Sequence, residues 1–256
     1  MERRQSKMDL ERVIAVRTSK TIYRTGEQVV KVFDEDYSKV DVLNEALNQA
    51  IVEGLGLHIP KIYSVESIEG KWAIVSEYIK GKTIADLMQM HPEKKSEYLE
   101  QFVDLQLSMH QVKCSNLKKL KDKMNAKITQ TDLDATTRYE LHTRLEGMPK
   151  HNKLCHGDFN PSNVIIREDG TPFIIDWSHA TQGNASADVA RTYLLFWLNQ
   201  EGETANQYLD LYCQKSGVAK KYIQSWLPIV AASQSVKGHQ NERDLLLNWV
   251  NVVDYE

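Results

Sequence analysis

The sequence predicts an α+β fold in which a five-stranded antiparallel sheet with one helix precedes a mostly helical region. Short apolar and β-branched segments separated by turn residues predict five strands, at 11–16, 21–25, 28–33, 61–65 and 71–79. Residues 40–53 carry apolar side chains at helical spacing, which predicts a helix between the third and fourth strands. Helical spacing also dominates residues 84–147 and the chain beyond 190. The strands therefore gather at one end of the chain and the helices at the other.

The overall composition favours a cytoplasmic enzyme over a membrane or nucleic-acid-binding protein. The chain has 256 residues and a net charge of −3, which provides no basic face for nucleic acid. No segment approaches the apolar length of a membrane span, and the first residues lack the apolar stretch of a signal peptide. The three cysteines, at 114, 155 and 213, form neither a disulfide framework nor a metal cluster.

The most informative segment is residues 156–163, His-Gly-Asp-Phe-Asn-Pro-Ser-Asn, followed thirteen residues later by Asp176. Asp158 is a candidate base, and Asn163 and Asp176 are candidate metal ligands. The apolar runs 164–166 and 173–175 predict two strands joined by a tight turn at 168–170. Pairing of these strands would bring Asn163 and Asp176 to the same end. This arrangement suits phosphoryl transfer, in which protein groups position the reactants and neutralise charge.

The spacing of these three residues matches the kinase pattern of a catalytic loop and a distal metal-binding Asp. Gly157 stands where protein kinases have Arg, and Trp177-Ser178 replaces Phe-Gly after the metal-binding Asp. With Asn160-Pro161-Ser162-Asn163, these departures make the segment similar to the aminoglycoside phosphotransferase and choline kinase superfamily of small-molecule kinases. The resemblance is specific over 154–192 and in register from about 11 to 110.

The resemblance implies a bilobal protein-kinase-like fold. Residues 1–79 would form an N-terminal nucleotide-binding lobe, and residues 80–256 a C-terminal catalytic and substrate-binding lobe. Only eleven residues, 177–187, separate Asp176 from the next helix, so there is no room for the long activation segment of protein kinases. A small-molecule acceptor is therefore favoured over a peptide.

The resemblance also implies a set of nucleotide-binding residues. Lys31, the only cation inside the third strand, would hold the α- and β-phosphates of ATP and pair with Glu45. Backbone groups at about Glu77 and Ile79 would bind adenine. The turn between the first two strands has no Gly, so Ser19 would contribute its hydroxyl and N–H to a phosphate, with Lys20 adding charge.

Asp158 would accept or orient the proton of the acceptor hydroxyl, while Asn163 and Asp176 would hold one or two Mg²⁺ ions. ATP would be the co-substrate, with GTP as an alternative, because backbone groups at about Glu77 and Ile79 would bind the base. Three further residues, His110, His156 and Asp188, are expected to have structural roles. Asp188 in particular would support the catalytic loop through backbone hydrogen bonds.

The acceptor remains open at this stage. An aminoglycoside is the first choice, with choline, ethanolamine, homoserine and sugar-like alcohols as competitors. Residues 179–256 contain eight Asp and Glu against six Lys and Arg, a slight acidity that suits a cationic acceptor. The candidate amine-binding residues are Glu242, Asp244, Asp254 and Glu256. Two other classes remain possible, a catalytically silent nucleotide-binding module and a metal-dependent hydrolase that uses His156, Asp158 and Asp176.

Overall fold

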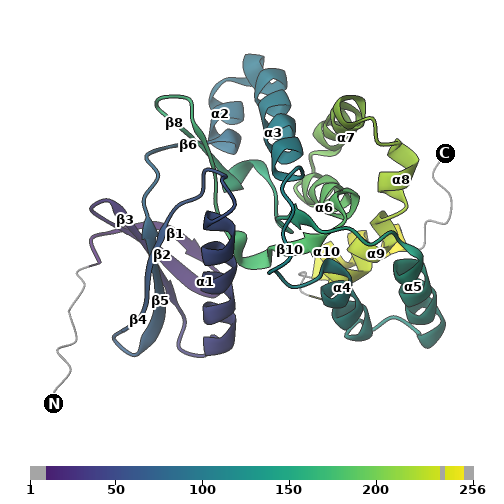
Figure 1. Ribbon diagram of the computed structural model, residues 1–256, viewed down its shortest axis with the longest axis horizontal. Coiled ribbons are helices and arrows are strands. Elements are labelled where there is room, and N and C mark those ends of the chain that lie inside the picture. Colours follow the sequence, from purple (N-terminus) through teal and green to yellow (C-terminus); the bar gives the residue numbers. More distant parts are fainter. Residues whose placement is uncertain (1–9, 237–239, 251–256) are drawn as a thin grey trace. The chain divides into compact units, whose positions relative to one another are not determined.

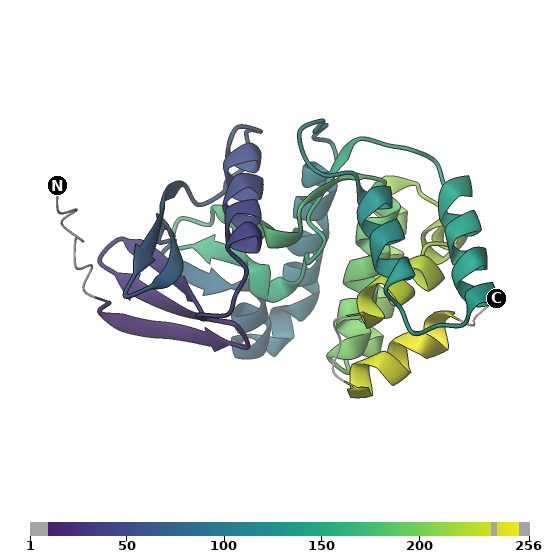
Figure 2. The ribbon, with the colours of Figure 1, turned by 90° about the horizontal axis from the view of Figure 1, so that it is seen from below.

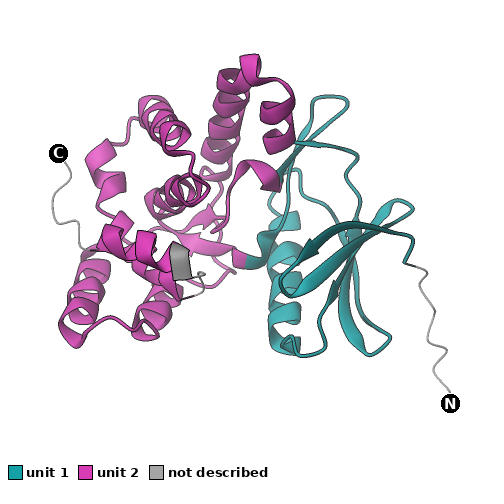
Figure 3. Ribbon diagram, turned by 180° about the vertical axis from the view of Figure 1, so that it is seen from behind, with its two compact units in different colours: residues 1–83, 164–178 teal, residues 84–163, 179–256 magenta. Residues whose placement is uncertain are grey.

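The computed structural model describes residues 10–236 and 240–250, and the chain divides into two compact units (Figure 3). Unit 1 comprises the chain up to Thr83 together with Val164–Ser178, and unit 2 comprises the rest. This division differs from the two continuous segments expected from the sequence, 1–79 and 80–256. The functions assigned to those segments remain predictions.

Unit 1 contains the expected five-stranded antiparallel sheet. Its strands are β1 (Arg12–Arg17), β2 (Lys20–Thr25), β3 (Gln28–Phe33), β4 (Ile62–Ile68) and β5 (Lys71–Glu77). They lie in the order β1-β2-β3-β5-β4, with every neighbouring pair antiparallel. Helix α1 (Lys39–Glu53) connects β3 and β4 and lies against one face of the sheet (Figure 1, Figure 2). The predicted fold class is thus confirmed for this part of the chain.

The alternation of side chains along β3 decides which of them face α1. Val30 and Val32 are buried on one face of the sheet, while Phe33 is buried on the other face with Val42 and Ala46 of α1. Because successive residues of a strand point to opposite faces, Lys31 lies on the same face as Phe33. The period of two therefore directs the single cation of β3 toward α1.

Residues 164–178 belong to unit 1 because they form a hairpin that pairs with a short strand of that unit, residues 81–83. β8 (Val164–Arg167) lies between β6 (Gly81–Thr83) and β9 (Pro172–Ile174). The Ile174 N–H donates to the carbonyl of His58 at 3.1 Å, and the rings of His58 and Phe173 stack at 5.4 Å. The predicted hairpin turn at 168–170 is present between β8 and β9.

Unit 2 is mostly helical, as expected. Its helices are α2 (Ile84–Met90), α3 (Lys95–Met109), α4 (Leu120–Thr129), α5 (Ala135–Gly147), α6 (Ala185–Leu198), α7 (Gly202–Ser216), α8 (Lys220–Gln224), α9 (Leu227–Ser235) and α10 (Gln240–Val250). A two-stranded sheet pairs β7 (Lys153–Cys155) with β10 (Thr181–Gly183). No helix within the described residues combines the length and apolar character needed to cross a membrane.

An aromatic cluster anchors the loop that follows β7. Phe159 is fully buried, and its ring stacks on that of Phe102 of α3 at a centroid distance of 4.4 Å. Phe196 and Tyr208 pack against Phe102 from α6 and α7. The Thr192 hydroxyl donates to the Phe159 carbonyl at 2.8 Å. These contacts hold the backbone of the residue that follows Asp158.

Candidate active site

In unit 1, Lys31 and Glu45 form a buried ion pair. Lys31 Nζ lies 2.7 Å from Glu45 Oε1, and the two side chains are only 12% and 5% exposed. Burial alone would lower the pKa of Lys31, but the charges of Asp176 and Glu45 and their hydrogen bonds outweigh it and raise the pKa above its ordinary value. Lys31 is therefore a permanent cation.

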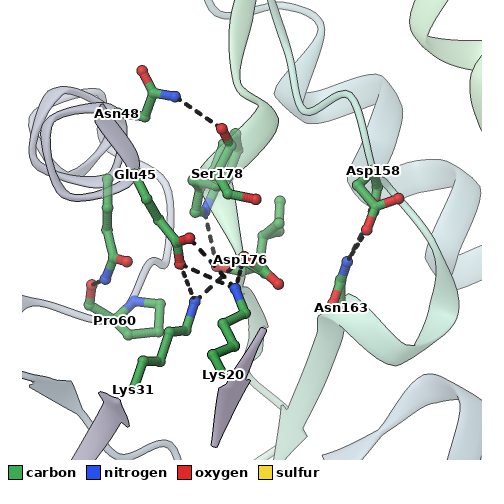
Figure 4. Close-up of polar contacts among 12 residues, drawn as sticks. Lys20, Lys31, Glu45, Asn48, Pro60, Asp158, Asn163, Asp176 and Ser178 are labelled. Atoms are coloured by element: carbon green, nitrogen blue, oxygen red, sulfur yellow. Dashed lines mark hydrogen bonds and ion pairs between the residues drawn. The ribbon is translucent and has the colours of Figure 1, made fainter. Parts of the chain in front are cut away.

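Asp176 joins this cluster from the end of the β8–β9 hairpin. Its Oδ1 lies 3.3 Å from Lys31 Nζ, and its side chain is 29% exposed (Figure 4). Asp176 has a φ of +62°, a conformation that L-residues other than Gly seldom adopt. The Asn48 side chain on α1 donates to the Ser178 carbonyl at 3.2 Å, which ties the chain after Asp176 to α1. The predicted trio of Lys31, Glu45 and Asp176 thus meets within one unit.

In unit 2, residues 156–163, here called the catalytic loop, hold Asp158 through side-chain amides. Asn163 Nδ2 donates to Asp158 Oδ2 at 3.1 Å and to its carbonyl at 2.9 Å (Figure 4). Asn160 Nδ2 donates to the same carbonyl at 3.0 Å. Asn163 ends a 3₁₀ turn, Pro161–Asn163, and directly precedes β8. Asp158 and Asn163 therefore lie in hydrogen-bonding contact, with the Asp158 side chain 29% exposed.

Asp188 braces the catalytic loop from the first turn of α6. Its carboxylate accepts from the N–H groups of His156 at 3.1 Å and Gly157 at 2.7 Å, and it lies 3.1 Å from His110 Nε2. His110 Nδ1 lies 3.0 Å from the hydroxyl of Tyr212. His156 is fully buried, and its Nδ1 accepts from the Asp158 N–H at 3.2 Å. The expected structural roles of His110, His156 and Asp188 agree with these contacts.

Comparison with models of protein families identifies the family to which this chain belongs. The model of the phosphotransferase enzyme family matches residues 11–222, which include both parts of the candidate site. The chain belongs to the phosphotransferase enzyme family. Membership makes it a phosphotransferase. A comparison with curated protein sequences found no match.

Solved structures similar to this family member share its protein-kinase-like fold. An aminoglycoside phosphotransferase in ternary complex with AMP-PNP and hygromycin B is 17% identical, with a TM-score of 0.68 over 93% of this chain and 90% of that chain. A choline/ethanolamine kinase family protein from Mesorhizobium loti is 14% identical, with a TM-score of 0.63 over 96% of this chain and 89% of that chain. The choline kinase LicA from Streptococcus pneumoniae is 17% identical, with a TM-score of 0.62 over 93% and 90% of the two chains. At these identities, the likeness supports the fold and leaves the acceptor open.

Lys20 is a second cation beside the cluster of Lys31, Glu45 and Asp176, and the sequence analysis assigned it only a contribution of charge. Its Nζ lies 3.4 Å from Glu45 Oε2 and 3.8 Å from Asp176 Oδ1 (Figure 4). In the ladder of β2 and β3, Lys20 is the direct partner of Phe33 and Ile22 that of Lys31, so all four side chains point to the α1 face. Once the register of β2 and β3 is known, Lys20 can be placed near Lys31, because it pairs with Phe33, which lies two residues after Lys31 on the same face.

Arg191 contacts the catalytic loop, and sequence reasoning gave it no role. It lies on α6, one turn after Asp188, with its Nε 3.3 Å from the Gly157 carbonyl. Its Nη2 lies 3.5 Å from Asp158 Oδ1. The sequence could have indicated this contact, because Arg191 lies three positions after Asp188, and residues three apart on a helix share a face.

The remaining predicted nucleotide-binding residues have these places in the phosphotransferase. Ser19 lies in the turn between β1 and β2, where its carbonyl accepts from the Asp34 N–H at 3.1 Å. Glu77 ends β5, and its N–H donates to the Lys61 carbonyl at 2.8 Å, so an adenine contact at Glu77 would use its carbonyl. Ile79 lies two residues further on and is 6% exposed. Their contacts with a nucleotide stay predictions.

The four acidic candidates for amine binding are divided between described and undescribed parts of the chain. Glu242 and Asp244 lie on α10, whereas Asp254 and Glu256 lie outside the described residues. Glu242 acts electrostatically on Arg191 of α6. An amine-binding role for any of them stays a prediction.

Proposed function

We propose that this enzyme transfers the γ-phosphoryl group of ATP to a hydroxyl group of a small molecule in a Mg²⁺-dependent reaction. The observation that carries the proposal is the cluster of Lys31, Glu45 and Asp176 in unit 1. These residues come from β3, α1 and the end of a distant hairpin, yet their charged atoms lie within 3.3 Å of Lys31 Nζ. A buried cation beside a partly exposed carboxylate suits a triphosphate and its metal.

Lys31 and Lys20 would bind phosphate oxygens, with Glu45 holding both ammonium groups in place. Both ammonium groups would already be in position before the nucleotide binds. The side chains would therefore need to move little as charge develops on the phosphates. Ser19 would add a hydroxyl and an N–H from the β1–β2 turn. Glu77 and Ile79 would bind the base through backbone groups, which allows ATP or GTP.

The oxygens of Asp176 and Asn163 fit Mg²⁺, which prefers carboxylate and carbonyl ligands. The Asp176 carboxylate is 29% exposed, and the Asn163 amide nitrogen faces Asp158, so its amide oxygen is the atom that would serve as ligand. When bound, Mg²⁺ would neutralise the phosphate oxygens.

Asp158 would orient the acceptor hydroxyl and take its proton. The hydroxyl oxygen forms a bond to the γ-phosphorus, the bond from that phosphorus to the β–γ bridging oxygen breaks, and ADP leaves. Asn163, Asn160 and Arg191 hold the Asp158 carboxylate or its backbone, so the general base is positioned before the acceptor binds.

The test is ADP release from MgATP with a panel of aminoglycosides, choline, ethanolamine, homoserine and simple sugars, with Asp158→Ala as the control. We expect turnover that depends on an acceptor, is lost in Asp158→Ala and is stopped by EDTA. Nucleotide binding should be nearly unchanged in the variant. Equal ADP release by the two proteins would contradict the role of Asp158. MgATP binding without any transfer would favour a silent nucleotide-binding module.

A further inference from the structure

A buried series of hydrogen bonds in unit 2 ends at the residue that follows Asp158. The Tyr208 hydroxyl of α7 donates to Gln106 Oε1 of α3, and Gln106 Nε2 donates to the Thr192 hydroxyl oxygen of α6 at 3.3 Å. The Thr192 hydroxyl in turn donates to the Phe159 carbonyl at 2.8 Å. All four residues are fully buried. Tyr208, Gln106, Thr192 and Phe159 are called the Thr192 network below.

The direction of each donor in the Thr192 network follows from the Phe159 end. A carbonyl oxygen can only accept, so Thr192 has to direct its single hydroxyl proton to Phe159. The Thr192 oxygen then accepts from the amide nitrogen of Gln106, which turns the amide oxygen toward Tyr208. Burial raises the pKa of Tyr208, so its hydroxyl keeps the proton that it donates. The amide of Gln106 therefore sets which way the Thr192 hydroxyl points.

The same helix holds the catalytic loop on both sides of Asp158. Before it, Asp188 accepts from the Gly157 N–H at 2.7 Å, and Arg191 Nε donates to the Gly157 carbonyl at 3.3 Å. After it, Thr192 holds the next carbonyl. Asp188, Arg191 and Thr192 are three and four positions apart on α6, so they share one face of that helix.

The two carbonyls that follow the Asp158 side chain are both hydrogen-bonded. Asn160 and Asn163 donate to the Asp158 carbonyl, and Thr192 donates to that of Phe159. The two asparagines belong to the catalytic loop itself, whereas the Thr192 bond ties this stretch to α6. With consecutive peptide groups fixed, the backbone cannot rotate freely, and the direction of the Asp158 side chain is fixed with it.

We infer that Thr192 is a positioning residue for phosphoryl transfer and that Gln106 and Tyr208 direct its hydroxyl proton to the catalytic loop. Thr192 acts through the Phe159 peptide group, which holds the Asp158 carboxylate where it meets the acceptor hydroxyl. The inference rests on the proposed function, in which Asp158 orients that hydroxyl. Misplacement of a reacting group by about 1 Å can slow a reaction by about 10²-fold, so one buried hydroxyl is enough to affect the rate.

Substitutions at Thr192 test the inference by kinetics with the acceptor found in the panel above. Thr192→Val removes the hydroxyl and keeps the shape of the side chain. We expect kcat to fall by about tenfold or more with an unchanged KM for ATP, because the hydroxyl affects the position of Asp158 and not the nucleotide. Thr192→Ser keeps the hydroxyl and should retain most of the wild-type kcat. An unchanged kcat in Thr192→Val, or an equal loss in Thr192→Ser, would overturn the inference.

Thr131→Val is the matched control. Thr131 is also buried, and its hydroxyl donates to a backbone carbonyl, that of Ile128, at 2.7 Å. Both valine variants therefore lose a buried hydrogen bond of the same kind, and a general loss of stability would appear in both. We expect Thr131→Val to have the wild-type kcat. Circular dichroism shows whether each variant is folded.

Gln106→Met tests the direction of the network. The Thr192 hydroxyl remains in this variant, but no amide nitrogen occupies the side of its oxygen away from Phe159. We expect a loss of kcat smaller than that of Thr192→Val. A wild-type kcat in Gln106→Met would overturn the role of Gln106.

Hydrogen exchange at Asp158 measures the same role without turnover. The Asp158 N–H donates to His156 Nδ1, so it exchanges when the catalytic loop opens. Gly157-Asp158 is the only Gly-Asp pair in the sequence, so selective ¹³C-carbonyl and ¹⁵N labelling isolates this amide by NMR. We expect exchange to be faster by about tenfold or more in Thr192→Val and unchanged in Thr131→Val.

The Phe159 carbonyl reports on the hydrogen bond itself, because Phe159-Asn160 is the only Phe-Asn pair in the sequence and can be labelled in the same way. Its ¹³C shift should change in Thr192→Val and stay near the wild-type value in Thr192→Ser. If both NMR results hold, absence of transfer by the wild type would count against the proposed function alone. An exchange rate of the Asp158 amide that Thr192→Val leaves unchanged would overturn the inference, whatever the kinetics show.

Discussion

Lys20 and Lys31 share one carboxylate, because Lys20 Nζ lies 3.4 Å from both oxygens of Glu45, and Lys31 Nζ lies 2.7 Å from one of them. The family resemblance assigns the phosphate-binding role to Lys31. The β1–β2 turn contains no Gly. We propose that the Lys20 ammonium supplies positive charge to the phosphates, in place of the Gly-rich loop that covers them in protein kinases.

Removal of the Lys20 charge should weaken the use of ATP without abolishing it. We expect Lys20→Met to lower kcat/KM for ATP by about tenfold, because Lys31 remains in place. Steady-state kinetics with varied ATP measure the effect. Lys61→Met, which removes an exposed lysine of the same unit, is the control and should leave the constants unchanged. An unaltered kcat/KM in Lys20→Met would show that Lys20 only neutralises Glu45.

Lys31→Met should have the larger effect. We expect kcat/KM for ATP to fall by about 10²- to 10³-fold, since a fixed cation at the phosphates is lost from a buried position. Glu45→Gln leaves the lysine present but removes its main partner, so its loss should be smaller. Nucleotide titrations and single-turnover measurements separate binding from transfer. Similar kinetics for Lys31→Met and the wild type would exclude the phosphate-binding role.

Asp188 should contribute to stability above about pH 4 and lose that contribution in acid. Burial raises the pKa of Asp188, but the hydrogen bond and charge of His110, the charge of His156 and the Gly157 N–H outweigh burial and lower the pKa below its ordinary value of 3.8. A carboxyl group with a lowered folded-state pKa stabilises the protein above its unfolded-state pKa. That stabilisation is lost as the pH falls through the folded-state value.

We therefore expect Asp188→Asn to lower the free energy of unfolding by about 2–4 kcal/mol at pH 7. The difference from the wild type should shrink below about pH 4. Urea unfolding at a series of pH values measures it, with the exposed Asp36→Asn as the control. A difference that is independent of pH would mean that the carboxylate charge is not what braces the catalytic loop.

Gly157→Ala should destabilise the protein through two separate effects. Gly157 has a φ of +79°, and an added Cβ would lie 2.7 Å from the His179 carbonyl oxygen. We expect a loss of about 2–4 kcal/mol in the free energy of unfolding, from backbone strain and steric overlap together. Gly170→Ala is the matched control, because its φ is +84° with no atom within 4 Å of the added Cβ. It should lose only about 1–2 kcal/mol, and equal losses in thermal or urea unfolding would show that the loop relaxes around the new methyl group.

The sequence by itself determined the five strands of the sheet in unit 1, the hairpin of β8 and β9, the first helix and the order of the predicted nucleotide-binding residues. Alternation along β3 places Lys31 opposite to Val30 and Val32, a local periodicity that needs no knowledge of the rest of the chain. Glu45 was assigned through the family resemblance instead, and the structure buries it on α1 beside Val42 and Ala46, whereas Leu43 and Leu47 of the same helix are exposed. The motif from His156 to Asp176 was equally informative because its residues are close in sequence.

Only the tertiary structure decided the contacts between segments far apart in the chain. Lys20 joins the cluster through the register of β2 and β3, and residues 164–178 belong to unit 1 through pairing with β6. Lys127 of α4 and Arg191 of α6 line the same cavity of unit 2, together with Asp188. A local charge sum cannot predict such a grouping, since the potential in a cavity depends on which side chains the fold turns toward it.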